Sequence, residues 1–440
     1  MEAAILREFT AELIRARPEA DAELRRFRDI AGRNICMPET ELERHLNGAT
    51  ILVTGGTGCI GSSLMAELVA RHPARLVSIS RGGRDTSPNV PEYKRQESAE
   101  YLRADVSDPR AVEAVIGDIR PDIVFHLAAQ RSPGLAEIEV HRTVATNTLG
   151  ARNVLAAAAS AGTRQVVLAS TGKAVRPYSP EVYTASKRTA EWIATTAACD
   201  VTCSAARFTH VVDNSIVYER LLAWAAADNG GNGGNSNPDP IRLHSQDVAF
   251  YAQSAIESAQ LLLIAMLGGV RGEFRVHAIT DLGWPISLLD VALGVLASTG
   301  SATPLYISGY DPGYEEVAFP GLYDPATAGD VSPLLNAFEA AIAAPGPCHR
   351  VDSFRLRMAP DPATPKLLDA LAQACARTRD NSVIQHALDE LSWSVLDASL
   401  AMADTSALRR SAMLTSRFED GMSQVHRKIA RAITTHANLL

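Results

Sequence analysis

The sequence lacks the features that mark secreted, membrane and nucleic-acid-binding proteins. Its opening segment, MEAAILREFTAELIRAR, mixes charged side chains into the apolar ones, which suits neither a signal peptide nor a membrane span. No stripe of basic residues appears, and the formal net charge of −8 argues against a nucleic-acid partner. We therefore expect a cytoplasmic protein with no membrane partner and no nucleic-acid partner.

Cysteines are few and scattered, and they form no metal-binding pattern. The six are Cys36, Cys59, Cys199, Cys203, Cys348 and Cys375. Cys199 and Cys203 have C-x-x-x-C spacing, but no second pair of cysteines or histidines completes a zinc site. We expect no metal and predict that both of these cysteines are core residues.

What the sequence does contain is the composition of a large globular chain. It has 440 residues, of which 46% are hydrophobic and 21% charged, enough for one large or two medium domains. From residue 50 to about 210, strand-like and helix-like segments alternate, which is typical of an α/β fold with a doubly wound parallel sheet. The predicted strands are 51–54, 76–80, 100–104, 122–127, 165–170 and 202–208.

Residues 51–61, ILVTGGTGCIG, are the most informative stretch. A short apolar strand runs into a turn with Gly55, Gly58 and Gly61, and a helix-like segment follows. These glycines let the backbone approach a pyrophosphate and let the helix pack closely, with its N-terminus facing the anion. A lone glycine-rich turn often holds no ligand, but the strand before it and the helix after it favour a dinucleotide site. The predicted binding residues of this turn are Gly55, Thr57, Gly58, Cys59, Ile60 and Gly61.

The end of the second strand indicates which dinucleotide binds. Sites that select NAD place an acidic residue there to accept from the ribose 2′-hydroxyl. This chain has Ser80 and Arg81, with Arg84 close behind. A hydroxyl and guanidinium groups suit a 2′-phosphate, so NADP is the predicted cofactor. If Arg81 only covers the adenine face, NAD remains open.

The chain divides into four expected parts. Residues 1–48 form an N-terminal helical extension and residues 49–230 a Rossmann domain that binds NAD(P). Residues 231–345 form a smaller substrate-binding lobe, and residues 346–440 a helical C-terminal extension. The Gly- and Asn-rich segment 228–240 is expected to be a flexible surface loop. We expect the C-terminal extension to serve in packing or in a homo-oligomer, with partner binding as the alternative.

A second chemical feature is the pair Tyr183 and Lys187 in VYTASKRTAEW. Four residues apart, they lie on one face of a helix. The ordinary pKa of tyrosine is about 10, and a lysine ammonium together with a cationic nicotinamide ring lowers it toward the working range of a base. Lys187 can also bond the nicotinamide ribose. The spacing occurs by chance on solvated helix faces, but after a glycine turn it favours catalysis.

Ser170 and Thr171 follow the apolar run QVVLA. They lie at the end of a predicted strand, on the edge where ligands bind in open parallel sheets. A hydroxyl there can hold a substrate hydroxyl or carbonyl against Tyr183. Bonding to the following turn is the alternative, and it suits Ser170 better than Thr171, so Thr171 is the predicted catalytic residue.

Together these motifs resemble the extended short-chain dehydrogenase/reductase superfamily. VVLASTGKAVRP followed by VYTASKRTAEW is similar to its polysaccharide-biosynthesis branch of nucleotide-sugar 4,6-dehydratases and epimerases, and the resemblance covers roughly residues 49–320. It implies that Asp105 and Val106 meet the adenine. It also implies that Leu127, Ala128 and Ala129 form a small wall beside the nicotinamide, and that the substrate is a sugar or nucleotide-sugar.

The chain departs from this branch at several positions. Where the branch has the aspartate that protonates the departing C6 hydroxyl, this chain has Gly172, followed by a matching Lys173, and two residues are inserted before Tyr183. Asp311 and Phe250 fall where the branch has arginines that grip a pyrophosphate. The resemblance therefore implies that the residues for oxidation are intact, while the elimination acid and the arginines of the phosphate clamp are lost. Either the substrate has no diphosphate, or the protein binds the diphosphate in a different way.

Two classes of function follow. The first is an NADP-dependent enzyme that oxidises a sugar hydroxyl to a ketone and then epimerises or releases it. A variant of this class is a UDP-sugar 4,6-dehydratase that uses Lys173 as the acid. The second is a degraded cofactor-binding protein that serves in assembly. Retention of Thr171, Tyr183 and Lys187 favours the enzyme.

Overall fold

The computed structural model describes residues 2–82, 95–214, 217–227, 240–314 and 318–439. Arg84 and nearly all of the predicted flexible segment 228–240 lie outside these ranges. In the described part of the chain, no helix is both long and apolar enough to cross a membrane.

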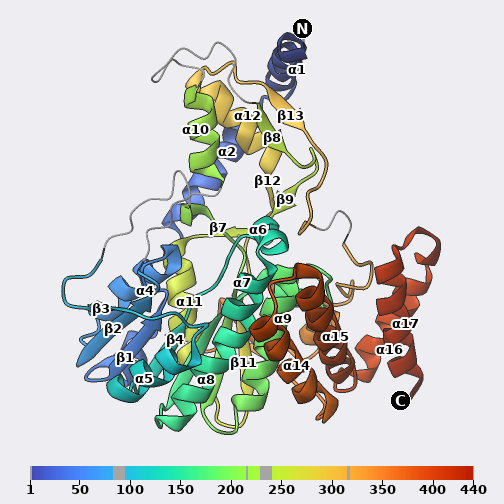
Figure 1. The fold of residues 1–440 in the computed structure, drawn as a ribbon. Helices are drawn as coiled ribbons and strands as arrows, with labels where there is room; N and C mark the ends of the chain where they lie inside the picture. The colour runs from blue at the N-terminus through green and yellow to red at the C-terminus, as the bar shows by residue number, and fades with distance from the viewer. Residues whose placement is uncertain (1, 83–94, 215–216, 228–239, 315–317, 440) are drawn as a thin grey trace.

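A nine-stranded sheet forms the centre of the larger lobe (Figure 1). Its strand order is β14-β15-β11-β6-β5-β4-β1-β2-β3. Neighbouring strands from β11 to β3 are parallel, and β15 and β14 are added antiparallel at one edge. The strands are β1 Thr50–Thr54, β2 Arg75–Ser80, β3 Glu100–Arg103, β4 Ile123–His126, β5 Gln165–Thr171, β6 Thr202–Phe208, β11 Phe274–Ile279, β14 Ala344–Pro345 and β15 Val351–Arg355.

The sheet confirms the predicted doubly wound α/β fold. All six predicted strands are present, and each begins and ends within one residue of its predicted bounds. The reason is burial on both faces: every residue of β4 is buried, as are four of the five residues of β1. Strands covered on both faces appear in a sequence as short continuous apolar runs.

The strand β11 differs from its expected location. Residues 274–279 fall within 231–345, the predicted substrate-binding lobe, but β11 pairs in parallel with β6 and extends the main sheet. The helix before it, α11 (Ala255–Leu267), packs on β5, β6 and β11, so it completes another strand–helix–strand unit. The sequence EFRVHAI predicts a strand at β11 but does not specify the sheet that the strand joins, because apolar strands of either lobe look alike.

Helices cover both faces of the sheet. On one face α4 (Cys59–Val69) packs beside α11, and on the other α5 (Pro109–Ile119), α8 (Gly150–Ser160) and α9 (Val182–Ala197) lie in sequence. Shorter helices connect them: α3 Glu39–Leu46, α6 Pro133–Ile138, α7 Val140–Val144 and α13 Ala337–Ala340. A π-helical segment at 145–149 joins α7 to α8, and 3-10 turns occupy 30–32, 172–175, 212–214 and 419–421.

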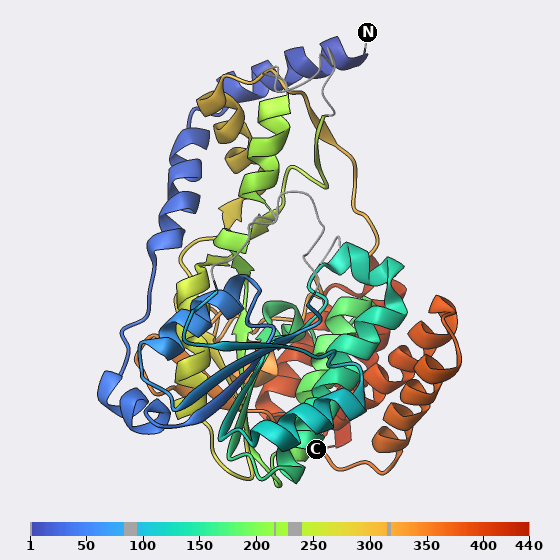
Figure 2. The ribbon, with the colours of Figure 1, turned by 60° about the vertical axis from the view of Figure 1, so that its left-hand side comes forward.

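A smaller lobe stands above the carboxyl end of the sheet (Figure 2). Its helices are α1 Glu2–Ala16, α2 Ala20–Asp29, α10 Tyr218–Ala227 and α12 Leu288–Thr299. Its short strands are β7 His210–Val211, β8 Ile241–Leu243, β9 Ala249–Phe250, β10 Ala252–Gln253, β12 Ile286–Ser287 and β13 Leu305–Ile307. The predicted N-terminal helices are confirmed, but α1 and α2 are not a separate appendage. They share one apolar core with α10 and α12, and a Cβ on Gly294 would lie 2.6 Å from the Ala20 carbonyl oxygen.

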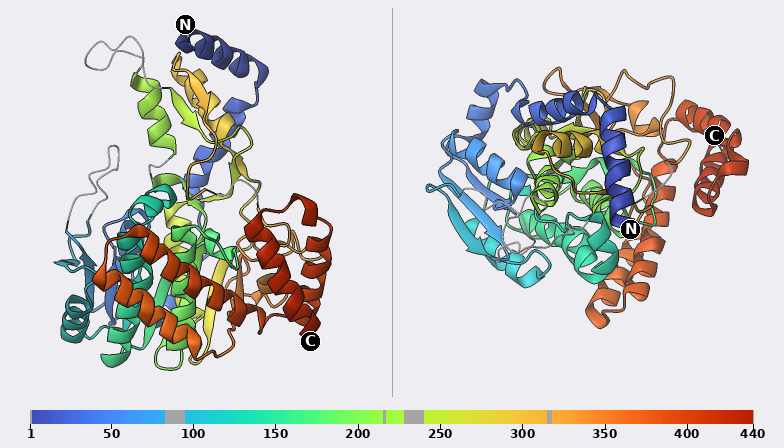
Figure 3. Two further views of the ribbon diagram at one scale, coloured as in Figure 1. Left: turned by 45° about the vertical axis from the view of Figure 1, so that its right-hand side comes forward. Right: turned by 90° about the horizontal axis from the view of Figure 1, so that it is seen from above.

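The C-terminal part is helical from residue 363, as predicted, but the predicted range 346–440 also contains β15, which belongs to the main sheet (Figure 3). The helices of this part are α14 Ala363–Arg377, α15 Asn381–Leu400, α16 Thr405–Ser416 and α17 Gln424–Leu439. α15 packs directly on α7 and α9, and α14 packs on α15. The Tyr178 ring stacks on Trp393 of α15 with ring centroids 3.9 Å apart. This extension therefore packs against the helix that carries Tyr183 and Lys187.

The prediction for the cysteine pair is half wrong. Cys203 is buried, but Cys199 is exposed because it follows the end of α9 in the turn before β6. No group of three or more histidine, cysteine, aspartate or glutamate side chains suited to a metal ion occurs within the described ranges.

Candidate functional site

The glycine turn is shaped as a cradle at the carboxyl end of β1. Gly55 has φ +77°, and a Cβ there would lie 2.9 Å from the Ala128 backbone nitrogen. A Cβ on Gly61 would lie 2.2 Å from the Gly55 carbonyl oxygen, so only glycine lets α4 approach this closely. Gly58 is the N-cap residue of α4, and it has no side chain that could bond the first backbone N–H groups of the helix. These residues fit a pyrophosphate approaching the start of α4.

Thr54 joins this cradle to the next strand. Its Oγ1 accepts from the backbone N–H groups of Leu127 at 3.1 Å and Ala128 at 3.0 Å, and lies 2.8 Å from His126 Nδ1. Leu127, Ala128 and Ala129 are half-buried beside the cradle, which suits the wall that the resemblance implied. Thr54 and His126 were missed by sequence reasoning. The available signal was two polar residues at the ends of two otherwise apolar strands.

The ribose end of the cradle lies at the ends of β2 and β3. Ser80 is half-buried and Arg81 is exposed. Arg103 pairs with Ser80 across the two strands, and its Cδ lies 3.3 Å from the place a Cβ on Gly82 would take. A second arginine that sequence reasoning missed therefore stands beside Ser80 and Arg81. Asp105 accepts from the Ser107 backbone N–H at 2.9 Å and hydroxyl at 2.8 Å, which fixes the turn after β3.

Thr171, Tyr183 and Lys187 come together at the carboxyl end of β5. Against the rise that burial causes, the Thr171 side chain acts to lower the pKa of the Tyr183 phenol, and Lys187 Nζ donates to the Ala169 carbonyl oxygen at 2.6 Å. Burial lowers the pKa of Lys187 to about 8, and Glu191 acts against this shift. The structure thus brings the three predicted catalytic residues to one place.

In this structure the pKa of Tyr183 is raised instead of lowered. Burial raises the pKa of Tyr183 above its ordinary value, while the Thr171 side chain and the Arg131 charge partly offset the rise. The expected lowering depends on a cationic nicotinamide ring as well as on Lys187, whose ammonium bonds the Ala169 carbonyl oxygen in this structure. Arg131, exposed before α6, is a further cation near Tyr183 that the sequence analysis missed.

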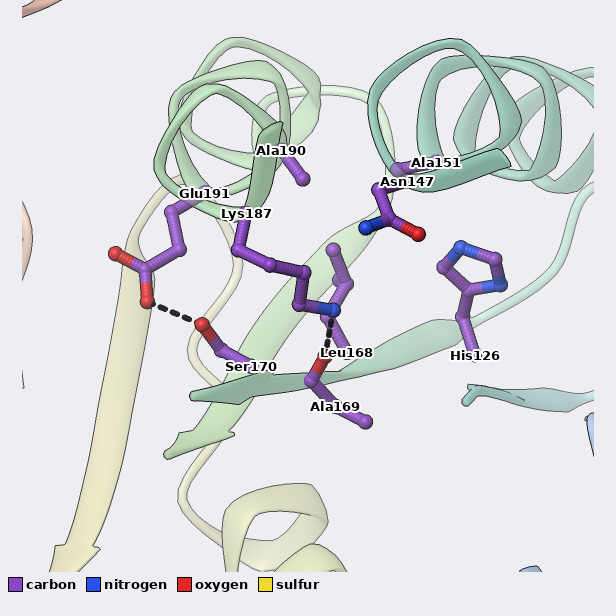
Figure 4. Close-up of a pocket in the computed structure, with 9 residues that line it drawn as sticks. All are labelled: His126, Asn147, Ala151, Leu168, Ala169, Ser170, Lys187, Ala190 and Glu191. Carbon is purple, nitrogen blue, oxygen red and sulfur yellow. Dashed lines mark hydrogen bonds between the residues drawn. The ribbon is translucent and has the colours of Figure 1, made fainter. Parts of the chain in front are cut away.

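A small cavity lies behind Lys187, with a volume of about 10 Å³ (Figure 4). This is on the order of the space that one water needs. Burial lowers the pKa of His126 to about 3, so this imidazole is neutral beside the lysine. The lining residues are His126, Asn147, Ala151, Leu168, Ala169, Ser170, Lys187, Ala190 and Glu191.

Lys173 is occupied by protein groups. Its Nζ donates to Glu181 Oε2 at 2.9 Å and to the Gly313 carbonyl oxygen at 3.1 Å, and lies 5.4 Å from the centre of the Tyr314 ring. Burial favours a higher pKa for Glu181, but Arg176 and Lys173 together hold it below its ordinary value. Lys173 therefore connects the loop after β5 to the 310–314 segment of the smaller lobe.

Gly172 faces an apolar side chain. A Cβ at this position would lie 2.8 Å from Leu334 Cδ2 and 3.3 Å from the Phe208 carbonyl oxygen. The aspartate of the resembled branch does not fit here unless Leu334 moves. The position of Leu334 beneath the loop therefore suits glycine at residue 172 and leaves no space for the aspartate side chain.

The two lost arginine positions have new roles. Asp311 pairs with Arg242 on β8, so its carboxylate is neutralised within the smaller lobe. The Phe250 ring lies 4.7 Å from the His210 ring and packs edge-on against Phe27 of α2 at 6.4 Å. Asp311 therefore carries a charge that is paired with Arg242, and Phe250 packs against α2 of the N-terminal helices.

Comparison with known families and sequences agrees with the motifs. Residues 51–217 match the family described as polysaccharide biosynthesis protein. The probable polysaccharide biosynthesis protein EpsC of Bacillus subtilis is 26% identical over 66% of this chain and 48% of its own length. A UDP-N-acetylglucosamine 4,6-dehydratase (inverting) of Campylobacter jejuni is 31% identical over 32% of this chain and 41% of its own length. The chain thus spans about half the length of the curated relatives it matches.

Solved structures share the fold. Pen from Bacillus thuringiensis aligns with a TM-score of 0.56 over 70% of this chain and 90% of its own, at 20% identity. MoeE5, solved in complex with UDP-glucose and NAD, aligns with a TM-score of 0.50 over 60% of this chain and 86% of its own, at 20% identity. The resemblance found in the motifs is confirmed: residues 51–217 match the polysaccharide-biosynthesis family, and the similar sequences include proteins named for polysaccharide biosynthesis and a UDP-N-acetylglucosamine 4,6-dehydratase.

Proposed function

We propose that this chain uses NADP to oxidise a hydroxyl of a sugar or nucleotide-sugar to a keto intermediate, with epimerisation or dehydrogenation as the outcome. One observation carries the proposal: the end of β5 with Thr171 meets the segment of α9 with Tyr183 and Lys187, where Lys187 Nζ bonds the Ala169 carbonyl oxygen, and this meeting point lies at the same edge of the sheet as the glycine cradle. In the related fold, MoeE5 was solved with UDP-glucose and NAD, which supports a nicotinamide cofactor and a nucleotide-sugar.

Each residue has a defined part in this chemistry. Thr171 donates to or accepts from the substrate oxygen and orients it toward Tyr183. Tyr183 would take the hydroxyl proton once the positive charges of an oxidised nicotinamide and of Lys187 offset the burial that raises its pKa, and Lys187 would bond the ribose of the cofactor. A bound nicotinamide would supply the acceptor for the hydride. Thr54, Gly55 and Ala128 hold the backbone around the cofactor without filling its space.

The loop after β5 favours retention of the C6 hydroxyl. Loss of water requires a proton donor beside the leaving oxygen. Gly172 supplies none, Leu334 occupies the adjoining space, and Lys173 is bonded to Glu181 and Gly313. The dehydratase that uses Lys173 is the second candidate, supported by the named dehydratase relative. A degraded assembly protein is the third.

Product mass distinguishes these candidates. The protein is incubated with NADP and UDP-N-acetylglucosamine, UDP-glucose or a free sugar, and the product is analysed by mass spectrometry and at 340 nm. We expect an unchanged mass with altered retention, or a loss of two hydrogens with NADPH formed. Loss of one water would restore the dehydratase, and if Lys173→Ala then abolishes that loss alone, lysine is its acid. No product with any sugar would favour the assembly protein.

Arg81→Asp tests the choice of cofactor. Because a carboxylate repels a 2′-phosphate and accepts from a 2′-hydroxyl, the variant is expected to bind NADP at least about tenfold more weakly and NAD no more weakly. Fluorescence titration of both cofactors gives the dissociation constants. Arg103→Ala, which removes the neighbouring guanidinium, should weaken NADP alone. If the wild type binds NAD more tightly than NADP, or Arg81→Asp leaves the preference unchanged, the 2′-phosphate site is wrong.

A further inference from the structure

Four charged side chains form a closed group beside the site, which we call the ion ring: Arg188, Glu191, Arg207 and Glu339. Their side chains are 5%, 1%, 0% and 5% exposed. Arg207 on β6 bonds Glu191 of α9 at 2.8 Å and Glu339 of α13 at 2.6 Å. Arg188 bonds the same two carboxylates at 3.1 and 3.0 Å. Two positive and two negative charges are thus buried with complete pairing.

Stability alone does not account for such a group. Taking ions out of water is costly, and replacing buried ion pairs with apolar residues of similar volume is often neutral or stabilising. The ion ring is nevertheless built from three separate elements, and it is held further by the Leu334 carbonyl and the Ser399 hydroxyl. The contacts of the ion ring with neighbouring residues indicate a role other than stability.

The ion ring touches the site at the end of β5 and at the loop after it, where Arg188 donates to the Ala174 carbonyl oxygen at 3.4 Å. Ser170 Oγ donates to Glu191 Oε1 at 2.6 Å (Figure 4). Ser170 is followed directly by Thr171, and Glu191 lies one turn beyond Lys187 on α9. Glu191, Ser170 and Lys187 line the same small cavity. The carboxylate thus contacts the strand end that carries Thr171 and lies behind the lysine.

We propose that the Ser170–Glu191 contact is a positioning device for Thr171, Tyr183 and Lys187: the Glu191 carboxylate, held by two arginines, fixes the end of β5 against the turn of α9 that carries Lys187. This inference rests on the proposed function for its effect on turnover, but its effect on Lys187 is independent of any substrate. Glu191 is a positioning residue, because it acts through Ser170 and Lys187.

The surrounding charges agree with this role. Burial alone would raise the pKa of Glu191, but Arg207, Arg188 and the Ser170 hydroxyl hold it below its ordinary value, so the carboxylate stays charged. Burial lowers the pKa of Lys187, and Glu191 is the neighbour that opposes this shift. The charged and titratable side chains that face Lys187 or its partner are His126 on β4, Tyr183, Arg188 and Glu191 on α9, Arg207 on β6 and Glu339 on α13.

The test follows the titration of Lys187 itself. The chain has only five lysines, so NMR of protein labelled at the lysine ε-carbons resolves each one, and Lys187→Arg identifies its resonance. In Glu191→Gln, the Lys187 midpoint should fall by roughly half a pH unit or more, because the nearest negative charge is gone. Glu257→Gln is the matched control: it alters an equally buried carboxylate, paired with Arg33, and should leave the Lys187 midpoint unchanged.

A second variant tests the fixed strand end. Ser170→Ala removes one hydroxyl and keeps every charge, so it serves even if Glu191→Gln does not fold. With UDP-N-acetylglucosamine and NADP as the probe, kcat should fall about tenfold while KM and the alkaline limb of the pH profile stay unchanged. Wild-type turnover of Ser170→Ala, or a Lys187 midpoint in Glu191→Gln equal to that of Glu257→Gln, would overturn the inference. Absence of turnover in the wild type would instead count against the proposed function, and the NMR result would still decide this one.

Discussion

Tyr183→Phe is expected to lower turnover by about 10²-fold or more while leaving the fold and cofactor binding intact. The substitution removes only the phenolic oxygen, the atom proposed to take the substrate proton. Thr171 keeps a partner in the variant, because its Oγ1 also accepts from the Lys173 backbone N–H at 3.2 Å. Single-turnover formation of NADPH or of the epimerised product measures the chemical step, and cofactor titration measures binding separately.

Tyr178→Phe provides the matched control for this loss. It also deletes one phenolic oxygen from the loop before α9, but that hydroxyl bonds Asp389 of α15 and the ring stacks on Trp393. Tyr178→Phe should therefore keep most of its turnover and lose some thermal stability. Full activity in Tyr183→Phe would eliminate the tyrosine as the base.

Arg207→Met should destabilise the protein by about 3–5 kcal/mol. The arginine is 0% exposed and bonds both Glu191 and Glu339, so its removal leaves two buried carboxylates with only Arg188 to offset them. The methionine fills most of the space but supplies no donor. Urea unfolding followed by circular dichroism gives the change in the free energy of unfolding.

A surface pair sets the scale for that result. Arg142→Met breaks an ion pair with Glu139 whose side chains are 45% and 33% exposed, and it should cost less than about 1 kcal/mol. Equal unfolding midpoints for Arg207→Met and the wild type would mean that the buried carboxylates take up protons or water at little cost.

The parts of the site that the sequence predicted are local. Gly55, Gly58 and Gly61 act within one strand–turn–helix unit, and Tyr183 and Lys187 within one helical turn, so the spacing of the residues contains the geometry. The central strands such as β1 and β4 were predictable for a similar reason, because burial on both faces produces continuous apolar runs, whereas β3 at the edge of the sheet is mostly exposed.

The parts that were missed depend on contacts between distant segments. Leu334 beneath Gly172 and Glu339 against Arg207 join residues more than a hundred positions apart, and no periodicity marks such pairs. Arg207 did carry a signal, because a charged side chain inside an otherwise apolar strand needs a buried partner. The sequence does not identify that partner. It also does not predict that Lys187 bonds the Ala169 carbonyl oxygen beside the small cavity.

The close approach of α2 to α12 has a consequence for synthesis of the chain on the ribosome. The surface of α2 that carries Leu24 and Phe27 is buried against a helix that is made roughly 270 residues later. At a synthesis rate of about 5–20 residues per second, α2 waits for its partner on the order of tens of seconds. Throughout that interval its apolar face is uncovered, and β1 to β6 are synthesised within the same interval. The smaller lobe thus completes its core only after most strands of the main sheet have been made, and α2 is available to chaperones until then.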